Sequence, residues 1–140
     1  EPLPLAAAKV VLDRYATGEP TRQLESTGQS LLDAVESERP EESRAFLSFS
    51  GHPTWVFQQW SIDDPEILAQ AKTLLLQEML RRGVLMLNTH EVTTVHTSGD
   101  VHVVAQAYAE SLDIVGRALV ASNLLNLLEC EPIRPLFRVR

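Results

Sequence analysis

Apolar residues recur at intervals of three and four in the last third of the chain. They occupy Val101, Val104, Tyr108, Leu112, Val115 and Leu119, which is the spacing of one face of an amphipathic helix. Thr97, followed by Asp100 three residues later, forms a capping-box pattern at the start of this stretch. The pattern therefore predicts a long helix that begins at Thr97 and buries one face.

A second helix is predicted after Asp64 and Pro65, which form a typical helix start. Its apolar face comprises Ile67, Leu68, Ala71, Leu74, Leu75 and Met79. Arg81 and Arg82 followed by Gly83 give it a cationic, glycine-terminated end, which suits a helix C-terminus.

The first forty residues predict two more helices, separated by Gly18. Residues 4–18 are apolar nearly all round, so that helix requires cover on most sides. From Pro20 to Glu38 the apolar stripe comprises Leu24, Gly28, Leu31 and Val35. Gly28 on this stripe indicates either close approach of a neighbouring backbone or a glycine tolerated at the surface, and the pattern favours neither.

Strand patterns occur in two places. Residues 45–60 predict two strands around a turn at Ser50 to Pro53, because they are rich in aromatic and β-branched residues. Residues 84–88 form a short apolar run, and residues 91–97 alternate as in a half-buried strand. The fold class predicted from this order is α+β, with a small, mostly antiparallel sheet covered by helices. The polar run Glu38–Arg44, broken by Pro40, predicts a subdomain boundary.

Composition narrows the function classes. The chain has 140 residues, enough for one domain with a core, and a formal net charge of −7 with scattered basic residues. Nucleic acid and membranes are therefore not expected as partners, since no basic face and no apolar run of about 20 residues is present. Cys130 is the single cysteine, which excludes an internal disulfide and predicts a reducing, cytoplasmic location. Because the chain opens at Glu1 rather than Met, we expect it to be a piece of a longer protein.

Candidate chemistry is sparse. The sequence has no glycine-rich phosphate loop, no CxxC or HExxH motif and no nucleophile elbow. His90 and His96 would share one face of an unbroken strand, but about 20 Å apart, so they could bind one zinc ion only if the chain folded back. No metal site is predicted. Lys9 and Lys72 are the only lysines, and neither has the surroundings of a Schiff-base lysine.

Three segments resemble class III aminotransferases, which depend on pyridoxal phosphate (PLP). They are EPLPLAAAKVVLDRY at the start of the chain, LLLQEMLRRGVLML in the middle and VHTSGDVHVVAQAYAESLDIV near the end. Their order and spacing match that family, and the branch containing glutamate-1-semialdehyde aminomutase is most similar. The resemblance implies that residues 1–40 correspond to the end of the large domain with its connecting helix, and that residues 41–140 form the α+β small domain.

The same resemblance implies a homodimeric fold type I enzyme, a transferase or isomerase, whose catalytic lysine and PLP-binding residues lie upstream of this chain. No catalytic or cofactor-binding residue is therefore assigned here, and PLP is expected in the parent enzyme but not in this chain alone. Leu87 to His90 stand where the aminomutases carry a Pro-Ser-Gln-like turn, which argues against glutamate semialdehyde as substrate.

Asn88 and His90 are the candidate substrate-side residues, because their loop can face the mouth of the active site. A purely structural role for His90 is the competing interpretation. His96 matches a junction between the last strand and the last helix, where it is expected to form hydrogen bonds.

Two functions remain open at this stage. The chain is either the C-terminal part of an aminotransferase or aminomutase, partnered by the missing N-terminal cofactor domain, or a free-standing, non-catalytic interaction module. Because a fragment would lack the normal cover of the apolar first helix, we expect a homodimer or larger assembly through residues 1–18.

Overall fold

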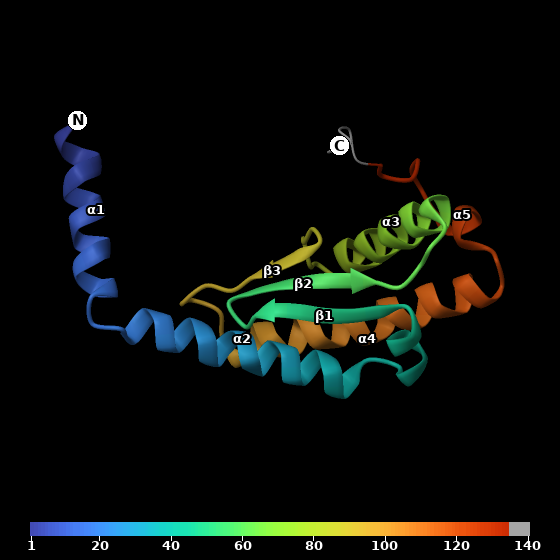
Figure 1. The fold of residues 1–140 in the computed structure, drawn as a ribbon, viewed down its shortest axis with the longest axis horizontal. Helices are drawn as coiled ribbons and strands as arrows, with labels where there is room; N and C mark the ends of the chain where they lie inside the picture. The colour runs from blue at the N-terminus through green and yellow to red at the C-terminus, as the bar shows by residue number, and fades with distance from the viewer. Residues whose placement is uncertain (135–140) are drawn as a thin grey trace.

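Helices and a small sheet alternate along the chain in the computed structural model, which describes residues 1–134 (Figure 1). The helices are α1 (Pro2–Tyr15), α2 (Glu19–Glu38), the 3₁₀ helix η1 (Glu41–Ala45), α3 (Pro65–Arg81), α4 (Ser98–Val120) and α5 (Leu124–Leu127). The strands are β1 (Leu47–His52), β2 (Trp55–Trp60) and β3 (Thr89–Glu91), which form an antiparallel sheet in the order β1-β2-β3. The predicted α+β class, with a small antiparallel sheet and covering helices, is confirmed.

Helix α4 lies at the centre of the core. Its apolar stripe is buried, with Tyr108, Leu112 and Val115 fully inaccessible to solvent. Tyr108 meets Phe49 of β1 edge to face at 5.5 Å between ring centroids, so α4 covers one face of the sheet. Helices α2 and α3 both pack against α4 and add Leu31, Val35, Leu74, Leu75 and Met79 to the same core. Each such side chain contributes about 1.5–3 kcal/mol by leaving water.

The predicted starts of α3 and α4 are confirmed by the hydrogen bonds of their caps. Thr97 Oγ1 accepts a hydrogen bond from the backbone N–H of Asp100, and the Asp100 carboxylate accepts one from the Thr97 N–H at 2.7 Å. At the start of α3, the Asp64 carboxylate accepts from the N–H groups of Glu66 and Ile67. These side chains satisfy backbone donors that the first helical turn leaves without partners.

Gly28 lies where α2 passes closest to the β1–β2 hairpin. A methyl group added there would stand 2.0 Å from the carbonyl oxygen of Pro53 and 3.2 Å from the backbone nitrogen of Thr54. Of the two interpretations of Gly28, close approach of a neighbouring backbone is therefore confirmed.

The hairpin turn lies later than predicted. Strand β1 continues through Ser50 and Gly51 to His52, and the turn is formed by Pro53 and Thr54. Gly51 has a φ of 111°, a conformation that glycine adopts without strain. Because Gly51 keeps the chain in the ladder opposite Val56, the strand extends past the residues that were predicted to turn.

Neither strand predicted after α3 forms as predicted. Residues 84–88 lie outside the ladder, and of residues 91–97 only Glu91 belongs to β3. Exposure nevertheless alternates along Val84 to Leu87 as in a half-buried strand. A strand needs a neighbouring backbone to pair with, and β2 lies beside Thr89–Glu91 only. Just before this strand, the carbonyl oxygen of Asn88 accepts a hydrogen bond from the backbone N–H of Gln58.

Residues 92–97, the rest of the second predicted strand, form a turn instead. The N–H of His96 donates to Thr93 O, and the N–H of Thr93 donates to the His96 ring at Nδ1. These local hydrogen bonds replace the ladder, and Val95 at the tip is 80% exposed. Alternating hydrophobicity at this point therefore reflects a turn that leads into the α4 cap.

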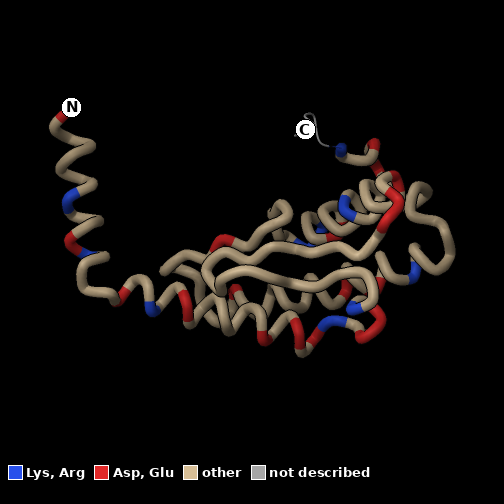
Figure 2. Tube along the Cα trace, viewed as in Figure 1, with Lys and Arg blue, Asp and Glu red and all other residues tan. Residues whose placement is uncertain are grey.

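The polar run Glu38–Arg44 is packed rather than extended as a free linker. Arg39 is buried, donates to Leu47 O at 2.7 Å and lies over the Phe49 ring at 5.4 Å. Glu36 receives ion pairs from both Arg39 and Arg44. A division of the chain at residue 40 stays a prediction. Figure 2 shows Lys and Arg spread over several elements, as the sequence indicated.

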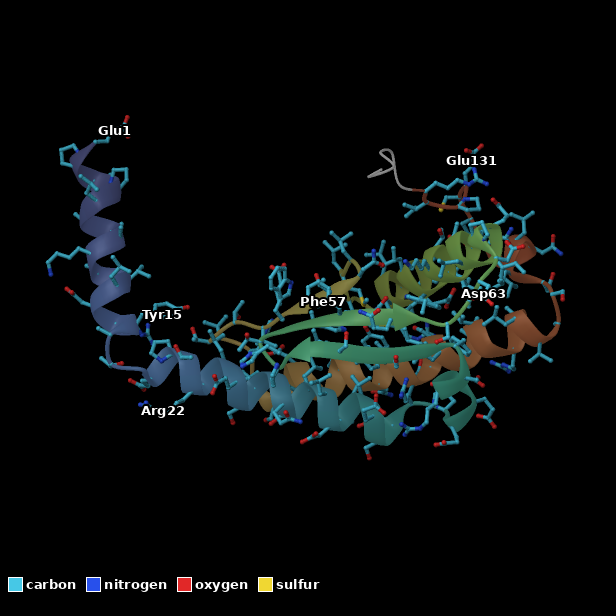
Figure 3. The ribbon with its side chains drawn as sticks, viewed as in Figure 1. Glu1, Tyr15, Arg22, Phe57, Asp63 and Glu131 are labelled. Carbon is cyan, nitrogen blue, oxygen red and sulfur yellow. The ribbon has the colours of Figure 1, made fainter. Side chains whose placement is uncertain are left out.

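Helix α1 extends away from the rest of the described chain (Figure 1). None of its residues is buried, and Leu3, Leu5, Val10 and Leu12 are each at least 68% exposed. The side chains of α1 accordingly project into open space between Glu1 and Tyr15 in Figure 3. The cover that its apolar sequence requires is not supplied by residues 19–134. Across residues 1–134, each helix is either too short or too polar for a bilayer crossing.

Candidate functional site

His90 is held at the edge of the sheet with its ring directed to the helix side. It lies in β3 opposite Val56, a buried position, so its side chain points to the face that α4 covers. There its Nε2 forms a short hydrogen bond with the hydroxyl of Tyr108, and the two rings meet edge to face at 5.2 Å between centroids. Burial lowers the pKa of His90 from 6.5 to about 4, so the ring is neutral at neutral pH.

A chain of hydrogen bonds determines which His90 nitrogen carries the proton. The indole N–H of Trp60 can only donate, and it donates to Gln58 Oε1 at 3.3 Å. The Gln58 amide therefore presents its NH₂ to Tyr108, whose hydroxyl accepts at 2.7 Å. The hydrogen of the buried Tyr108 hydroxyl then needs an acceptor of its own, and among residues 1–134 His90 Nε2 is the one within hydrogen-bond distance. The proton of neutral His90 is thereby assigned to Nδ1.

Tyr108 itself does not ionise in this setting. Burial raises its pKa well above the ordinary value of 10, against a smaller opposite effect of the hydrogen bond from Gln58. The network from Trp60 to His90 therefore keeps one arrangement of hydrogens over the physiological range of pH.

A hollow of about 670 Å³ adjoins His90. Its walls come from α2, from residues 83–92 and from the first turns of α4, which brings together segments far apart in the sequence. The walls are mainly apolar, with Leu31, Val84, Met86, Val92, Val101 and Val104. The polar groups at its border are Thr27, Thr89, His90, Glu91, His96 and Asp100. No Lys or Arg within residues 1–134 borders this hollow.

The two predicted substrate-side residues are neighbours with different surroundings. His90 borders the hollow, whereas Asn88 is exposed, does not border it and contributes its backbone carbonyl to Gln58 N. Their assignment to a substrate stays a prediction. His96 also borders the hollow, and its hydrogen bond with Thr93 agrees with the role expected for it at the junction before α4.

The other two histidines lie on the surface. His52 is the last residue of β1, and its Nδ1 contacts Thr54 Oγ1 in the hairpin turn at 3.0 Å. His102, which lies off the apolar stripe of α4, has a side chain that is 69% exposed. Within residues 1–134, no three ligand-type side chains are gathered closely enough for a metal ion.

Sequence reasoning missed Tyr108, Gln58 and Trp60 as parts of a polar network. Tyr108 was counted only as an apolar position of its helix. A signal was nevertheless present, because a tyrosine in the middle of a buried stripe must find a partner for its hydroxyl.

A second polar cluster surrounds Glu78 on α3, whose side chain is 5% exposed. Burial raises its pKa, but hydrogen bonds from Arg82 and Gln77 and the charge of Arg81 outweigh this effect and hold the pKa below its usual range. Arg82 also pairs with Glu110 at 2.8 Å, and Arg81 pairs with Glu129 at 2.6 Å. The charges in this cluster satisfy one another and join α3 to α4 and to the C-terminal segment.

Comparison with known proteins gives one informative match. No protein-family model matches the chain, and curated proteins provide no match either. Among solved structures, the chain is similar to the structure of the PLP internal aldimine form of the FumI protein of Sphingopyxis sp. MTA144, with a TM-score of 0.58 and 19% sequence identity. The similarity covers 78% of this chain and 26% of that one. The chain thus spans about a quarter of the length of that protein and shares the fold of the part that it spans.

Proposed function

We propose that the chain is the C-terminal part of a PLP-dependent aminotransferase or aminomutase, whose small domain closes over the substrate. The observation that carries this proposal is the match to only 26% of a structure containing PLP, together with the ordered resemblance of three segments to class III aminotransferases. Residues 41–140 are then the small domain, and residues 1–40 are the end of the large domain with its connecting helix. The exposed thiol of Cys130 suits a cytoplasmic enzyme.

The lysines of this chain do not suit a covalent attachment of PLP. Lys9 lies on exposed α1 and pairs with Asp13 at 2.6 Å. Lys72 lies on α3, and neither residue borders the hollow beside His90. A Schiff-base lysine requires a desolvated pocket or a cationic neighbour, so the catalytic lysine is assigned to the missing N-terminal cofactor domain. The isolated chain is then inactive, and the parent enzyme uses PLP as an electron sink for amino-group transfer.

Within the parent, Asn88 and His90 are assigned to the substrate side. Both lie between α3 and α4, on a segment carried by rigid helices, which is where binding residues concentrate. The three resembling segments favour the glutamate-1-semialdehyde aminomutase branch. The Leu87–His90 sequence departs from that branch at this segment, so a different substrate is proposed.

The test uses the source gene. The reading frame should continue upstream of Glu1 into a domain with a catalytic lysine, and the long product should bind PLP stoichiometrically with visible absorbance that is lost when that lysine is replaced. The present chain, dialysed against PLP, should retain none specifically, and Lys9→Arg and Lys72→Arg variants should behave like the parent chain. A reading frame that starts near Glu1, or stoichiometric PLP on this chain, would overturn the proposal.

A second candidate is a free-standing interaction module that assembles through α1. The observation that favours it is the exposure of Leu5, Val10, Val11 and Leu12, which form an apolar surface of a kind that usually marks an interaction site. Burial of four or five such side chains at about 1.5–3 kcal/mol each offsets much of the entropic cost of association. A homodimer or larger assembly through residues 1–18 is therefore proposed for the chain in isolation.

Sedimentation equilibrium at micromolar concentration tests this association. The chain should sediment as a dimer or larger species, and a Leu5→Glu, Val11→Glu double variant should be monomeric. Val120→Glu is the matched control, because Val120 is 90% exposed at the far end of α4, and this variant should assemble normally. A monomeric parent chain, or a double variant that assembles equally well, would refute association through α1.

A further inference from the structure

We propose that the hollow beside His90 binds an uncharged, largely apolar molecule through a single hydrogen-bond acceptor, which the Nδ1–H of His90 recognises. The inference rests on the proposed function in one respect, namely that this molecule is part of the substrate of the parent enzyme. Three properties of the hollow define its chemical class: the fixed donor, the sign of the charges around it and its apolar walls.

The donor is fixed by the chain of hydrogen bonds that begins at Trp60. Gln58 accepts from Trp60 and donates to Tyr108, and the buried hydroxyl of Tyr108 finds the acceptor for its own hydrogen in His90 Nε2. His90 Nδ1 consequently carries a hydrogen, and none of the described residues accepts it. Because His90 borders the hollow and its other nitrogen is occupied, the group that it offers to an occupant is a neutral N–H donor. A carbonyl or ether oxygen complements this donor.

The charges around the hollow exclude an anionic occupant. Among residues 1–134 no Lys or Arg borders it, whereas Glu91 and Asp100 do. A carboxylate or phosphate would therefore meet negative charge without a cationic partner. A cation is also disfavoured, because His90 is held as a donor and the Asp100 carboxylate is engaged by the N–H and hydroxyl of Thr97. The Glu91 carboxylate is exposed, so water screens its charge and an ion pair with it would contribute little.

The walls and volume complete the description. A hollow of about 670 Å³ lies in the size range of small-molecule sites, roughly 300–1,000 Å³, which are typically apolar with a few placed polar groups. Met86 and Leu31 face it from different segments, together with valines of α4 and of residues 84–92. Since burial of each methylene contributes about 0.8 kcal/mol, each carbon added to a fitting chain should tighten binding about fourfold.

Aliphatic ketones are suitable probes for the isolated chain. Heptanone, octanone and nonanone should bind with progressively lower Kd in titrations followed by NMR, with shifts centred on His90 and the surrounding valines. Octanoate and octylammonium, which have the same chain length, should bind at least tenfold more weakly than octanone. The side-chain nitrogen spectrum of His90 should report protonated Nδ1 and unprotonated Nε2 before ligand is added, with Nδ1 moving most on binding.

Variants separate the donor from the apolar walls. Replacing the ring in His90→Phe should abolish the preference for octanone over octanoate and octylammonium. Tyr108→Phe keeps the ring but removes the hydroxyl that fixes the tautomer. The nitrogen spectrum of His90 should then show both tautomers, and ketone binding should weaken. This variant provides the test if His90→Phe does not fold. His102→Phe, on the exposed face of α4, is the matched control and should bind like the parent chain.

Octanoate binding as tightly as octanone, or a His90 ring protonated at Nε2, would overturn the inference. So would ketone binding that His90→Phe and Tyr108→Phe leave unchanged. These outcomes are independent of the proposed function, which depends on the upstream domain and its PLP. If the parent enzyme contains PLP and is active but its small domain does not bind ketones, only this inference is refuted. If the chain binds ketones but its gene begins near Glu1, only the proposed function is refuted.

Discussion

Replacement of Gly28 by alanine should destabilise the fold, although the same change in an exposed helix stabilises it. Alanine is favoured over glycine inside a helix by about 1 kcal/mol. At Gly28, however, the new methyl group would stand 2.0 Å from Pro53 O and 2.5 Å from Pro53 C. Both are backbone atoms of the hairpin end, so a side-chain rotation cannot relieve the contact.

The size of the effect follows from the displacement required. The hairpin end or α2 must move by about an ångström before the contact becomes tolerable, and overpacking of this kind costs about 1–3 kcal/mol. After subtraction of the helical preference of alanine, Gly28→Ala should lower the free energy of unfolding by up to about 2 kcal/mol.

Gly116 provides the matched control, because it is also a glycine inside a long helix. Its added methyl group would lie 3.5 Å from a ring carbon of Phe46, which is ordinary contact. Gly116→Ala should therefore raise the free energy of unfolding by about 0.5–1 kcal/mol. Urea unfolding of both variants and the parent chain, followed by circular dichroism, measures the difference. If Gly28→Ala stabilised the chain as much as Gly116→Ala, α2 would not lie against the hairpin as described.

Three further outcomes are expected. Because burial lowers the pKa of His90 to about 4, the unfolded chain binds more protons than the folded chain between pH 6.5 and 4. Acidification through this window should therefore lower the free energy of unfolding by up to about 3 kcal/mol. In urea titrations at several pH values, a His90→Phe variant should lack this pH-dependent loss. Removal of the α4 cap by Thr97→Ala should cost about 1 kcal/mol in the same unfolding assay, whereas Thr93→Ala in the preceding turn, whose side chain caps nothing, should change little. Elemental analysis should find no stoichiometric metal, and a chelator should leave the melting temperature unchanged; a drop in chelator would contradict this.

The helical part of the fold could be predicted from sequence because its signals are local. Asp64 before Pro65 and Thr97 before Asp100 specify their caps within a few residues, and the α4 stripe repeats often enough to be unambiguous. The position of strand β3, Thr89–Glu91, could not be predicted in the same way. Exposed and half-buried side chains alternate along Val84–Leu87, as they do in a strand. Whether a strand forms there depends on the position of β2, which is a property of the folded chain.

The candidate site was only partly predictable for a similar reason. His90 was identified by its position in a loop of an expected substrate-facing segment. Its chemistry depends on Gln58, which lies 32 residues before it, and on Tyr108, which lies 18 residues after it. The register of the sheet and the packing of α4 bring these residues together. The sequence could indicate the histidine, whereas its tautomer required the folded network.

The isolation of α1 has a consequence for proteolysis. Since α1 buries no side chain, its helical state gains nothing from the core, and a helix of 14 residues is marginal on its own in water. Trypsin should therefore cut after Lys9 and Arg14 first and leave the remainder, from α2 onward, intact. In an assembly held together by α1 the same bonds would be protected, so the rate of cleavage would fall as protein concentration rises. The survival of this segment in a cell would then depend on how soon it meets the surface that covers it.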